Sequence, residues 1–179
     1  MKLTAQVRDL IESSPARCGP VRVIAVDGPS GAGKTVLAGL IAEEYRCPVI
    51  EVEDLIPGWD GLAEAPRLLT EQILEPLGQG RSGAYRRWDW YADDWAEIVE
   101  VPPVELLLIE GCGSSVRPAG DYAAVRLWLD APAEVRMARG LARDGETYRP
   151  YWQRWAAQEA ALFGADGTAE RADLRIDTS

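Results

Sequence analysis

The chain has 179 residues, of which 47% are hydrophobic and seven are tryptophan, so it has enough apolar material for one domain with a full core. Its formal net charge of −10 argues against nucleic acid or an anionic membrane as the main partner, because both repel an acidic surface. The chain has no histidine, and Cys18, Cys47 and Cys112 form no CxxC pair, which excludes the usual zinc sites. We therefore expect reduced thiols and a cytoplasmic protein, and a homodimer is left open.

The first predicted element is a helix over residues 3–13. Leu3, Val7 and Ile11 fall on one of its faces, and Thr4 is available as an N-cap. We expect this helix to pack on the outside of the core. A short β-branched run at residues 21–26 then predicts a buried strand, and residues 34–45 have the apolar spacing of a helix.

A glycine-rich segment between this strand and this helix follows the phosphate-binding pattern called Walker A. Its residues are Gly28, Pro29, Ser30, Gly31, Ala32, Gly33, Lys34 and Thr35. Glycines allow backbone N–H groups to point inward at an anion, and the start of the following helix adds positive potential. Lys34 would bridge the β- and γ-phosphates of a nucleoside triphosphate, and the Thr35 hydroxyl would hold magnesium. The segment therefore predicts a nucleotide site.

Two acids follow the next predicted strand, which covers residues 48–52. Because ligands of open α/β sheets bind beyond the carboxyl ends of the strands, Glu53 and Asp54 are candidates for chemistry and for contact with a substrate. Either could orient an acceptor hydroxyl and take up its proton. The alternative is that both are solvated loop acids or cap the next helix.

Residues 62–77 predict a helix and residues 78–83 a connector. In residues 84–95 arginines, acids and aromatic side chains alternate, and in an acidic chain this favours the wall of a small-molecule pocket. Arg86 and Asp89 are candidates for substrate contacts, and Trp59 is a further candidate as a stacking surface. The alternative, a surface hairpin with packed aromatic side chains, is equally open.

A strongly apolar strand at residues 104–109 ends at Glu110, which is the Walker B arrangement, in which a carboxylate reaches the magnesium shell. A further strand is expected at residues 123–129. Residues 151–163 predict a helix, and residues 172–177 predict an edge strand.

Between these elements, a helix that ends at Arg143 carries Arg136, Arg139 and Arg143 on one face. A polar connector with a glycine follows it. Together they suit a lid over about residues 139–151 that closes over the triphosphate, where Arg139 and Arg143 would stabilise charge on the moving phosphoryl group. The alternative is a solvated helix face paired with nearby acids.

The order of these motifs resembles the P-loop kinases of the uridine kinase type over nearly the whole chain after the first helix. The matching segments are Glu53-Asp54-Leu55-Ile56, Trp88-Asp89, Leu108-Ile109-Glu110-Gly111, Val135 to Asp144 and Arg171-Ala172-Asp173-Leu174. The resemblance implies that Asp54 is the catalytic base and joins Thr35 and Glu110 around magnesium. It also implies that Asp89 binds sugar hydroxyls.

Three departures from that family concern the substrate. Gly140 stands at a lid position that holds a sugar-binding arginine in uridine kinases. The Arg-Gly-Arg that usually follows the lid helix is missing, with Arg149 as the nearest substitute. The histidine that helps to read the pyrimidine is absent. Residues 27–31 are also similar to cytidylate kinase, but the chain leaves no room for the monophosphate-binding insertion of that family.

From these observations we predict one P-loop kinase domain over residues 1–179. Its fold would be a three-layer α/β/α P-loop NTPase with a five-stranded parallel sheet and a short lid. It would use Mg²⁺ and transfer the γ-phosphoryl group of ATP to a hydroxyl of a small molecule, with a nucleoside-like acceptor first. The alternatives are a non-nucleoside acceptor (a sugar, a vitamin precursor or an antibiotic) and a nucleotide-binding switch without kinase activity.

Overall fold

A five-stranded sheet forms the centre of the computed structural model, which describes residues 3–145 and 148–179. The strand order is β2-β5-β1-β6-β7, and every neighbouring pair is parallel. The strands are β1 (Arg22–Asp27), β2 (Val49–Glu51), β5 (Leu106–Glu110), β6 (Ala123–Asp130) and β7 (Leu174–Asp177). The parallel sheet is confirmed, and β7 lies at its edge as predicted.

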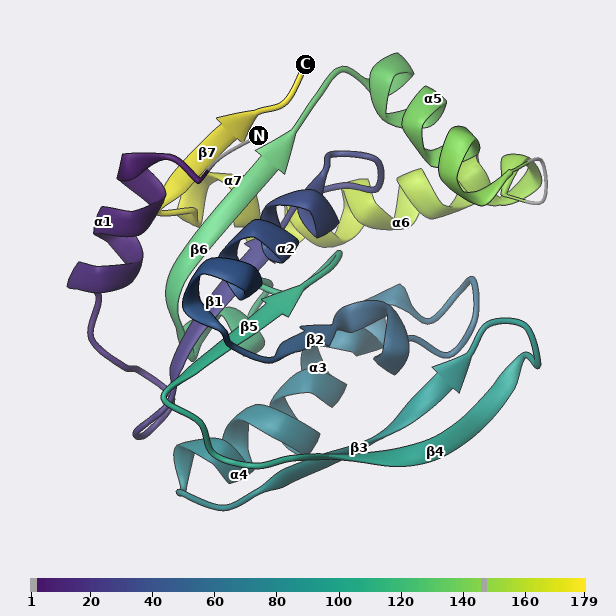
Figure 1. Ribbon diagram of the computed structural model, residues 1–179. Coiled ribbons are helices and arrows are strands. Elements are labelled where there is room, and N and C mark those ends of the chain that lie inside the picture. The colour runs from purple at the N-terminus through teal and green to yellow at the C-terminus, as the bar shows by residue number, and fades with distance from the viewer. Residues whose placement is uncertain (1–2, 146–147) are drawn as a thin grey trace.

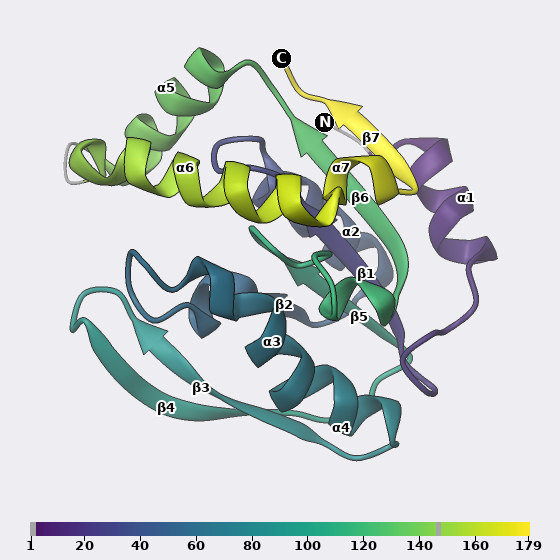
Figure 2. The same ribbon diagram turned by 180° about the vertical axis from the view of Figure 1, so that it is seen from behind.

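Helices cover both faces of the sheet, which makes three layers (Figures 1 and 2). On one face, α1 (Ala5–Ser13) and α2 (Lys34–Tyr45) bury side chains such as Ile11 and Ile41 against Ile24 and Leu127. On the other face lie the helical run of residues 62–78 and α6 (Arg149–Asp166). The interior strands are apolar on both sides because both faces are covered. The three-layer α/β/α fold is therefore confirmed.

The helix predicted at residues 3–13 begins at Ala5, because Thr4 is its cap: the Thr4 hydroxyl accepts a hydrogen bond from the Val7 amide at 3.4 Å. The run predicted as one helix at residues 62–77 is helical throughout but mixed in type. Its parts are η2 (Leu62–Glu64), α3 (Ala65–Leu69), the π-helical η3 (Thr70–Leu74) and α4 (Glu75–Gly78). Pro66 and Pro76 lie in the first turns of α3 and α4, where the missing N–H is tolerated.

A two-stranded antiparallel hairpin follows this run, formed by β3 (Gly83–Asp89) and β4 (Asp94–Val101). It lies beside α3 and α4, apart from the five-stranded sheet (Figures 1 and 2). Residues 84–95 therefore belong to a hairpin, which was the alternative to the expected pocket wall. Two tryptophans pack edge to face across its strands, with the Trp88 and Trp95 ring centroids 5.1 Å apart.

The predicted lid region lies within α5 (Ala133–Asp144) and the start of α6, at the carboxyl ends of the central strands (Figures 1 and 2). Residues 146–147, which fall in the predicted lid, lie outside the described residues. The remaining short elements are η1 (Val52–Leu55), η4 (Ala119–Asp121) and α7 (Thr168–Arg171). Across the described ranges, none of the helices has the length and apolar character that crossing a membrane requires.

Candidate active site

The Walker A segment forms the turn between β1 and α2, as the sequence predicts. Gly31 and Gly33 have φ angles of 79° and 92°, a left-handed region that favours glycine. In the part of the chain that the structure describes, the amides of these two glycines donate to no protein acceptor. Two backbone donors beside the N-terminus of α2 are thus available to an anion.

Asp27, the last residue of β1, anchors this loop and was not among the predicted site residues. Its side chain is fully buried (0% exposed). It accepts hydrogen bonds from the amides of Gly28 (2.8 Å), Gly113 (2.9 Å) and Ser115 (2.8 Å) and from the Ser115 hydroxyl (2.8 Å). Burial raises the pKa of Asp27, and these hydrogen bonds act against that shift. The carboxylate therefore joins the phosphate loop to the segment that follows β5.

Lys34 lies buried at the start of α2. Its Nζ donates to the Pro29 carbonyl at 3.2 Å and to the Cys112 thiol at 3.3 Å. Burial acts to lower the pKa of Lys34, but nearby groups that include Glu159 and Glu110 outweigh it, so the pKa is raised. The side chain is therefore cationic and lies along the phosphate loop.

Thr35 and Glu110 meet, as the pairing of a Walker A loop with a Walker B strand predicts. The Thr35 hydroxyl donates to Glu110 Oε1 at 3.0 Å. Burial raises the pKa of Glu110, while the charge of Lys34 and the Thr35 hydrogen bond act to lower it. A hydroxyl and a carboxylate at this spacing are oxygen ligands of the kind that Mg²⁺ prefers, so the residues present fit a magnesium ion.

Asp54 lies in η1, directly after β2, and its Oδ2 accepts a hydrogen bond from the Tyr85 hydroxyl of β3 at 3.3 Å. Burial raises the pKa of Asp54, while Tyr85 and the charge of Arg87 act to lower it. Glu53 is exposed, and its charge contributes to the raised pKa of Glu110. Glu53 therefore lies within electrostatic reach of the Walker B carboxylate.

Trp59 lies in an aromatic cluster that joins the loop after η1 to α6 and the hairpin. Its ring stacks on Tyr151 with centroids 4.3 Å apart and on Tyr148 at 5.4 Å. It also meets Trp90 at 5.2 Å and Trp155 at 5.9 Å, both edge on. Its partners in this structure are other aromatic side chains, so its predicted stacking surface is used inside the protein.

Arg86 and Asp89, predicted to contact substrate, make hydrogen bonds within the hairpin. Arg86 donates to two backbone carbonyls of β4. Asp89 Oδ1 accepts from the amides of Tyr91 (2.9 Å) and Ala92 (3.0 Å) in the turn, and these bonds lower the pKa of Asp89. Short polar side chains readily make such local bonds to backbone. In this structure Asp89 therefore holds the turn of the hairpin and Arg86 joins its two strands, and a contact of either residue with a substrate stays a prediction.

The arginines predicted on one face of the lid helix reach different parts of the molecule. Arg136 Nη1 donates to the Ser30 carbonyl of the phosphate loop at 3.4 Å. Arg139 Nη2 donates to the Thr178 carbonyl after β7 at 2.7 Å. The Thr178 hydroxyl in turn donates to the Ala32 carbonyl at 2.9 Å. Arg139 is therefore linked to the phosphate loop through Thr178. Arg136, which was not chosen as a catalytic candidate, contacts the loop directly.

Arg143 and Arg149 lie further along the lid region. Arg143 pairs with Asp144 at 2.7 Å, and this hydrogen bond raises the pKa of Arg143, with a further contribution from the charge of Glu53. Arg143 therefore lies within electrostatic reach of Glu53. Arg149 is the first residue of α6.

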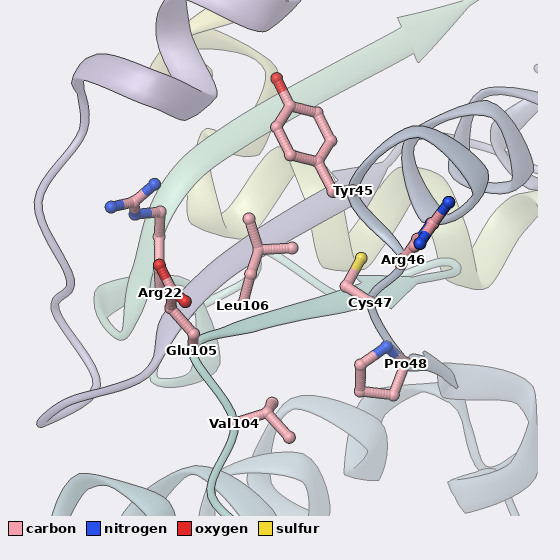
Figure 3. A pocket seen from close by; sticks show the side chains of 8 residues that line it. All are labelled: Arg22, Tyr45, Arg46, Cys47, Pro48, Val104, Glu105 and Leu106. Atoms are coloured by element: carbon pink, nitrogen blue, oxygen red, sulfur yellow. The ribbon is translucent and has the colours of Figure 1, made fainter.

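A hollow of about 450 Å³ lies at the other end of the sheet (Figure 3). It is bordered by the end of α2 and by the amino ends of β1 and β5, with Leu106 between Arg22 and Arg46 in the view. Ligands of parallel α/β sheets bind at the carboxyl ends of the strands. This hollow is therefore separate from the candidate site.

Comparisons with known proteins bear on the fold of the chain. No protein-family profile matches the chain. The chain is 28% identical over 141 residues to a cytidylate kinase of Methanococcoides burtonii, and the match covers 78% of the chain and 73% of that protein.

Two of the solved structures that match the chain show the shared fold. One is described as a possible uridine kinase from Bacillus stearothermophilus, with a TM-score of 0.64 and 19% identity over 96% of this chain and 100% of that one. The other is a proposed fructose transport system kinase from Silicibacter, with a TM-score of 0.56 and 18% identity over 98% of this chain and 99% of that one. The chain therefore has the three-layer fold of the P-loop kinases, which confirms the resemblance carried by its sequence motifs.

Proposed function

We propose that the chain is an ATP-dependent phosphotransferase that moves the γ-phosphoryl group to a hydroxyl of a small molecule. The observation that carries the proposal is the meeting of Walker A and Walker B groups at the carboxyl end of the sheet. There the Thr35 hydroxyl bonds to Glu110, and Lys34 lies along a loop with open amides. The kinase names of the relatives in sequence and fold support a phosphotransferase.

The phosphates would bind the amides of Gly31 and Gly33 and the ammonium group of Lys34, which are preorganised donors for the charge on the transferred group. Thr35 and Glu110 would hold magnesium, which would neutralise part of the charge on the phosphates. Arg143 is proposed to add positive charge from the lid side, and Arg139 from the side of β7.

Asp54 is proposed as the residue that orients the acceptor hydroxyl and takes up its proton. Its pKa is raised by burial, which makes the carboxylate a better proton acceptor than a solvated one. Tyr85 holds the carboxylate from the side of the hairpin at 3.3 Å. Glu53, one residue earlier, is exposed at the same strand end and is proposed to contact the acceptor.

The acceptor is proposed to be nucleoside-like, as in the uridine kinase type. A second candidate is a non-nucleoside alcohol, and Gly140 favours it. A Cβ built there would lie 3.0 Å from the Trp152 ring and 3.2 Å from the Tyr148 ring. A longer side chain at this position would require the two rings to move, and the arginine that binds sugar in uridine kinases is missing here, so sugar recognition would have to come from other residues. Arg149, the nearest substitute for the missing Arg-Gly-Arg, is proposed to contact the acceptor.

The test combines acceptor screening with two variants. ATP-dependent phosphorylation is measured across nucleosides, sugars, vitamin precursors and aminoalcohol antibiotics, and binding of Mg²⁺·ADP is measured by calorimetry. Lys34→Ala is expected to lose nucleotide affinity and activity together. Asp54→Asn is expected to keep ADP affinity within about twofold and to lower turnover by about 10²–10⁴-fold.

Asp9→Asn, on the exposed side of α1, serves as the matched control and is expected to behave as wild type. Undiminished transfer by Asp54→Asn would remove Asp54 from the role of base. ATP turnover that no acceptor stimulates would contradict the phosphotransferase and favour a nucleotide switch.

A further inference from the structure

Ser30, in the middle of the phosphate loop, has each of its polar groups hydrogen-bonded to a side chain of α5 or α6. Its amide donates to Glu159 Oε1 at 2.8 Å, its hydroxyl accepts from Trp155 Nε1 at 3.0 Å, and its carbonyl accepts from Arg136 Nη1 at 3.4 Å. Ser30 is only 7% exposed. We call these four residues (Ser30, Arg136, Trp155 and Glu159) the Ser30 cluster.

Glu159 is a carboxylate inside the protein, 3% exposed. Besides the Ser30 amide it accepts a hydrogen bond from the Cys112 thiol at 3.1 Å, and its Oε2 lies 4.0 Å from Arg136 Nη1. Burying a charged group is costly unless it is paired and hydrogen-bonded. The buried carboxylate of Glu159 lies at the contact between α6 and the phosphate loop, where its hydrogen bonds to Ser30 and Cys112 offset that cost.

Trp155 and Glu159 are four residues apart on α6, so they share one helix face, and that face is turned to the loop. The same helix face is also linked, through Trp90, to the backbone of Glu53. The Trp155 ring meets Trp90 with centroids 6.2 Å apart, and Trp90 Nε1 donates to the Glu53 carbonyl at 3.1 Å. Through two indoles, the phosphate loop and the acid-bearing turn after β2 are attached to the same helix.

We propose that Trp155 and Glu159 are positioning residues for the nucleotide site: they fix Ser30 and thereby hold the amides of Gly31 and Gly33 in the arrangement that receives phosphate. This inference takes its ligand, ATP or ADP, from the proposed function. The order of the loop without nucleotide does not depend on that function. Neither residue needs to touch the nucleotide. A loop that is ordered before binding loses less conformational freedom when the phosphates arrive, which raises affinity.

The first experiment measures the loop without nucleotide. Hydrogen–deuterium exchange of peptides that cover residues 28–35 is compared between the wild-type chain and Trp155→Phe, which keeps an aromatic ring but removes the N–H donor. Trp152→Phe is the matched control, because Trp152 is also buried on α6 yet makes no hydrogen bond to residues 28–35, all of which the structure describes. We expect faster exchange in Trp155→Phe alone. Equal exchange in the two variants would overturn the inference.

The second experiment measures the affinity for Mg²⁺·ADP by calorimetry. Trp155→Phe removes the donor and Ser30→Ala the acceptor of the hydrogen bond between them, and Ser30→Ala also removes the contact of the Ser30 hydroxyl with the Cys112 thiol at 3.6 Å. Each variant is expected to weaken binding by about three- to tenfold, the usual range for one lost bond. The double variant is expected to bind no more weakly than the weaker single variant. Independent effects that multiply in the double variant would contradict a shared role.

Glu159 is tested with a conservative pair. Glu159→Gln keeps an oxygen that accepts from the Ser30 amide and is expected to bind ADP at least as tightly as wild type, because a negative charge near the phosphates is removed. Glu159→Ala loses the acceptor and is expected to bind about tenfold more weakly. Equal affinity of these two variants would overturn the role of Glu159. If the loop exchange responds to Trp155→Phe while the wild-type chain binds no ADP, the positioning role is supported and the proposed function is the part that fails.

Discussion

The substitution Asp27→Asn tests whether the buried carboxylate before the phosphate loop holds this end of the sheet together. The two side chains have nearly the same shape, so packing is preserved. The change replaces one oxygen acceptor by an NH₂ donor and removes a charge. In the wild-type chain both oxygens of Asp27 are used, each by two donors.

The magnitude follows from those contacts. If the new NH₂ group faces Ser115, the Ser115 hydroxyl can rotate to accept from it, but the Ser115 amide loses its acceptor. If it faces the other side, the amides of Gly28 and Gly113 both lose theirs. A buried donor without a partner costs roughly 1–3 kcal/mol, and removal of the buried charge offsets part of this. We expect a net loss of about 2 kcal/mol in the free energy of unfolding, which is roughly 4–8 °C in Tm for a domain of this size.

The assay is reversible thermal or urea unfolding without nucleotide, with Asp9→Asn as the exposed control. The control is expected to change the free energy of unfolding by less than about 0.5 kcal/mol. Since the anchored loop carries the open amides, Asp27→Asn is also expected to bind ADP more weakly at a temperature where it is fully folded. A Tm loss no larger than that of the control would refute the reasoning that the four hydrogen bonds of Asp27 hold the loop.

Three further predictions concern thiols and glycines. Cys47 is half-buried and is expected to react first with a thiol reagent at pH 8, whereas Cys18, which is fully buried and has a pKa raised by burial to about 11, is expected to react only after unfolding. Because this pKa lies above the usual 9.0, the contribution of Cys18 to stability is complete below about pH 9 and falls as the pH rises toward 11, which denaturant titrations at several pH values would detect. Gly31→Ala is expected to weaken ADP binding far more than Gly33→Ala: both have positive φ, but a Cβ on Gly31 would lie 2.2 Å from the Arg136 carbonyl, whereas the space at Gly33 is open. Similar losses in both variants would show that backbone strain alone, and not the contact with α5, limits the loop.

The strands of the sheet could be predicted because each is a short apolar run with local limits. The run predicted at residues 123–129 is β6 (Ala123–Asp130), and the run at 21–26 is β1 (Arg22–Asp27). Helix α2 follows the glycine-rich turn at the predicted bounds. These elements depend on the period of their own side chains and on the glycines and prolines beside them, all of which the sequence displays.

The second strand of the hairpin could not be predicted in the same way. In β4 the acids Asp94, Glu97 and Glu100 interrupt the apolar residues, and Ile98 is 70% exposed, so neither face shows a clean alternation. Its strand conformation comes from pairing with β3, which a local pattern does not reveal.

Contacts between distant segments explain the residues that sequence reasoning missed. Ser30 and Glu159 are 129 positions apart, and Asp27 and Ser115 are 88 apart, so no spacing rule joins them. Two signals were present. Asp27 stands directly at the carboxyl end of a buried strand, and Glu159 is an acid four positions from a tryptophan on a helix expected to pack. Both positions indicate a buried charge. The groups that pair with these carboxylates become known only when the fold brings distant segments together.

The electrostatics of the site give a reason why metal and nucleotide would enter together. Glu51 and Glu110 lie opposite each other in the register of β2 and β5, and the pKa values of both are raised by burial, with the neighbouring acids adding to the shift. This end of the sheet therefore favours a cation. The protein oxygens that already meet are those of Thr35 and Glu110, and Mg²⁺ is usually held by one or two protein oxygens together with substrate phosphates. A nucleotide whose phosphates lie along Lys34 would complete such a shell, so the same geometry that binds the phosphates would also recruit the ion that neutralises the strand-end acids.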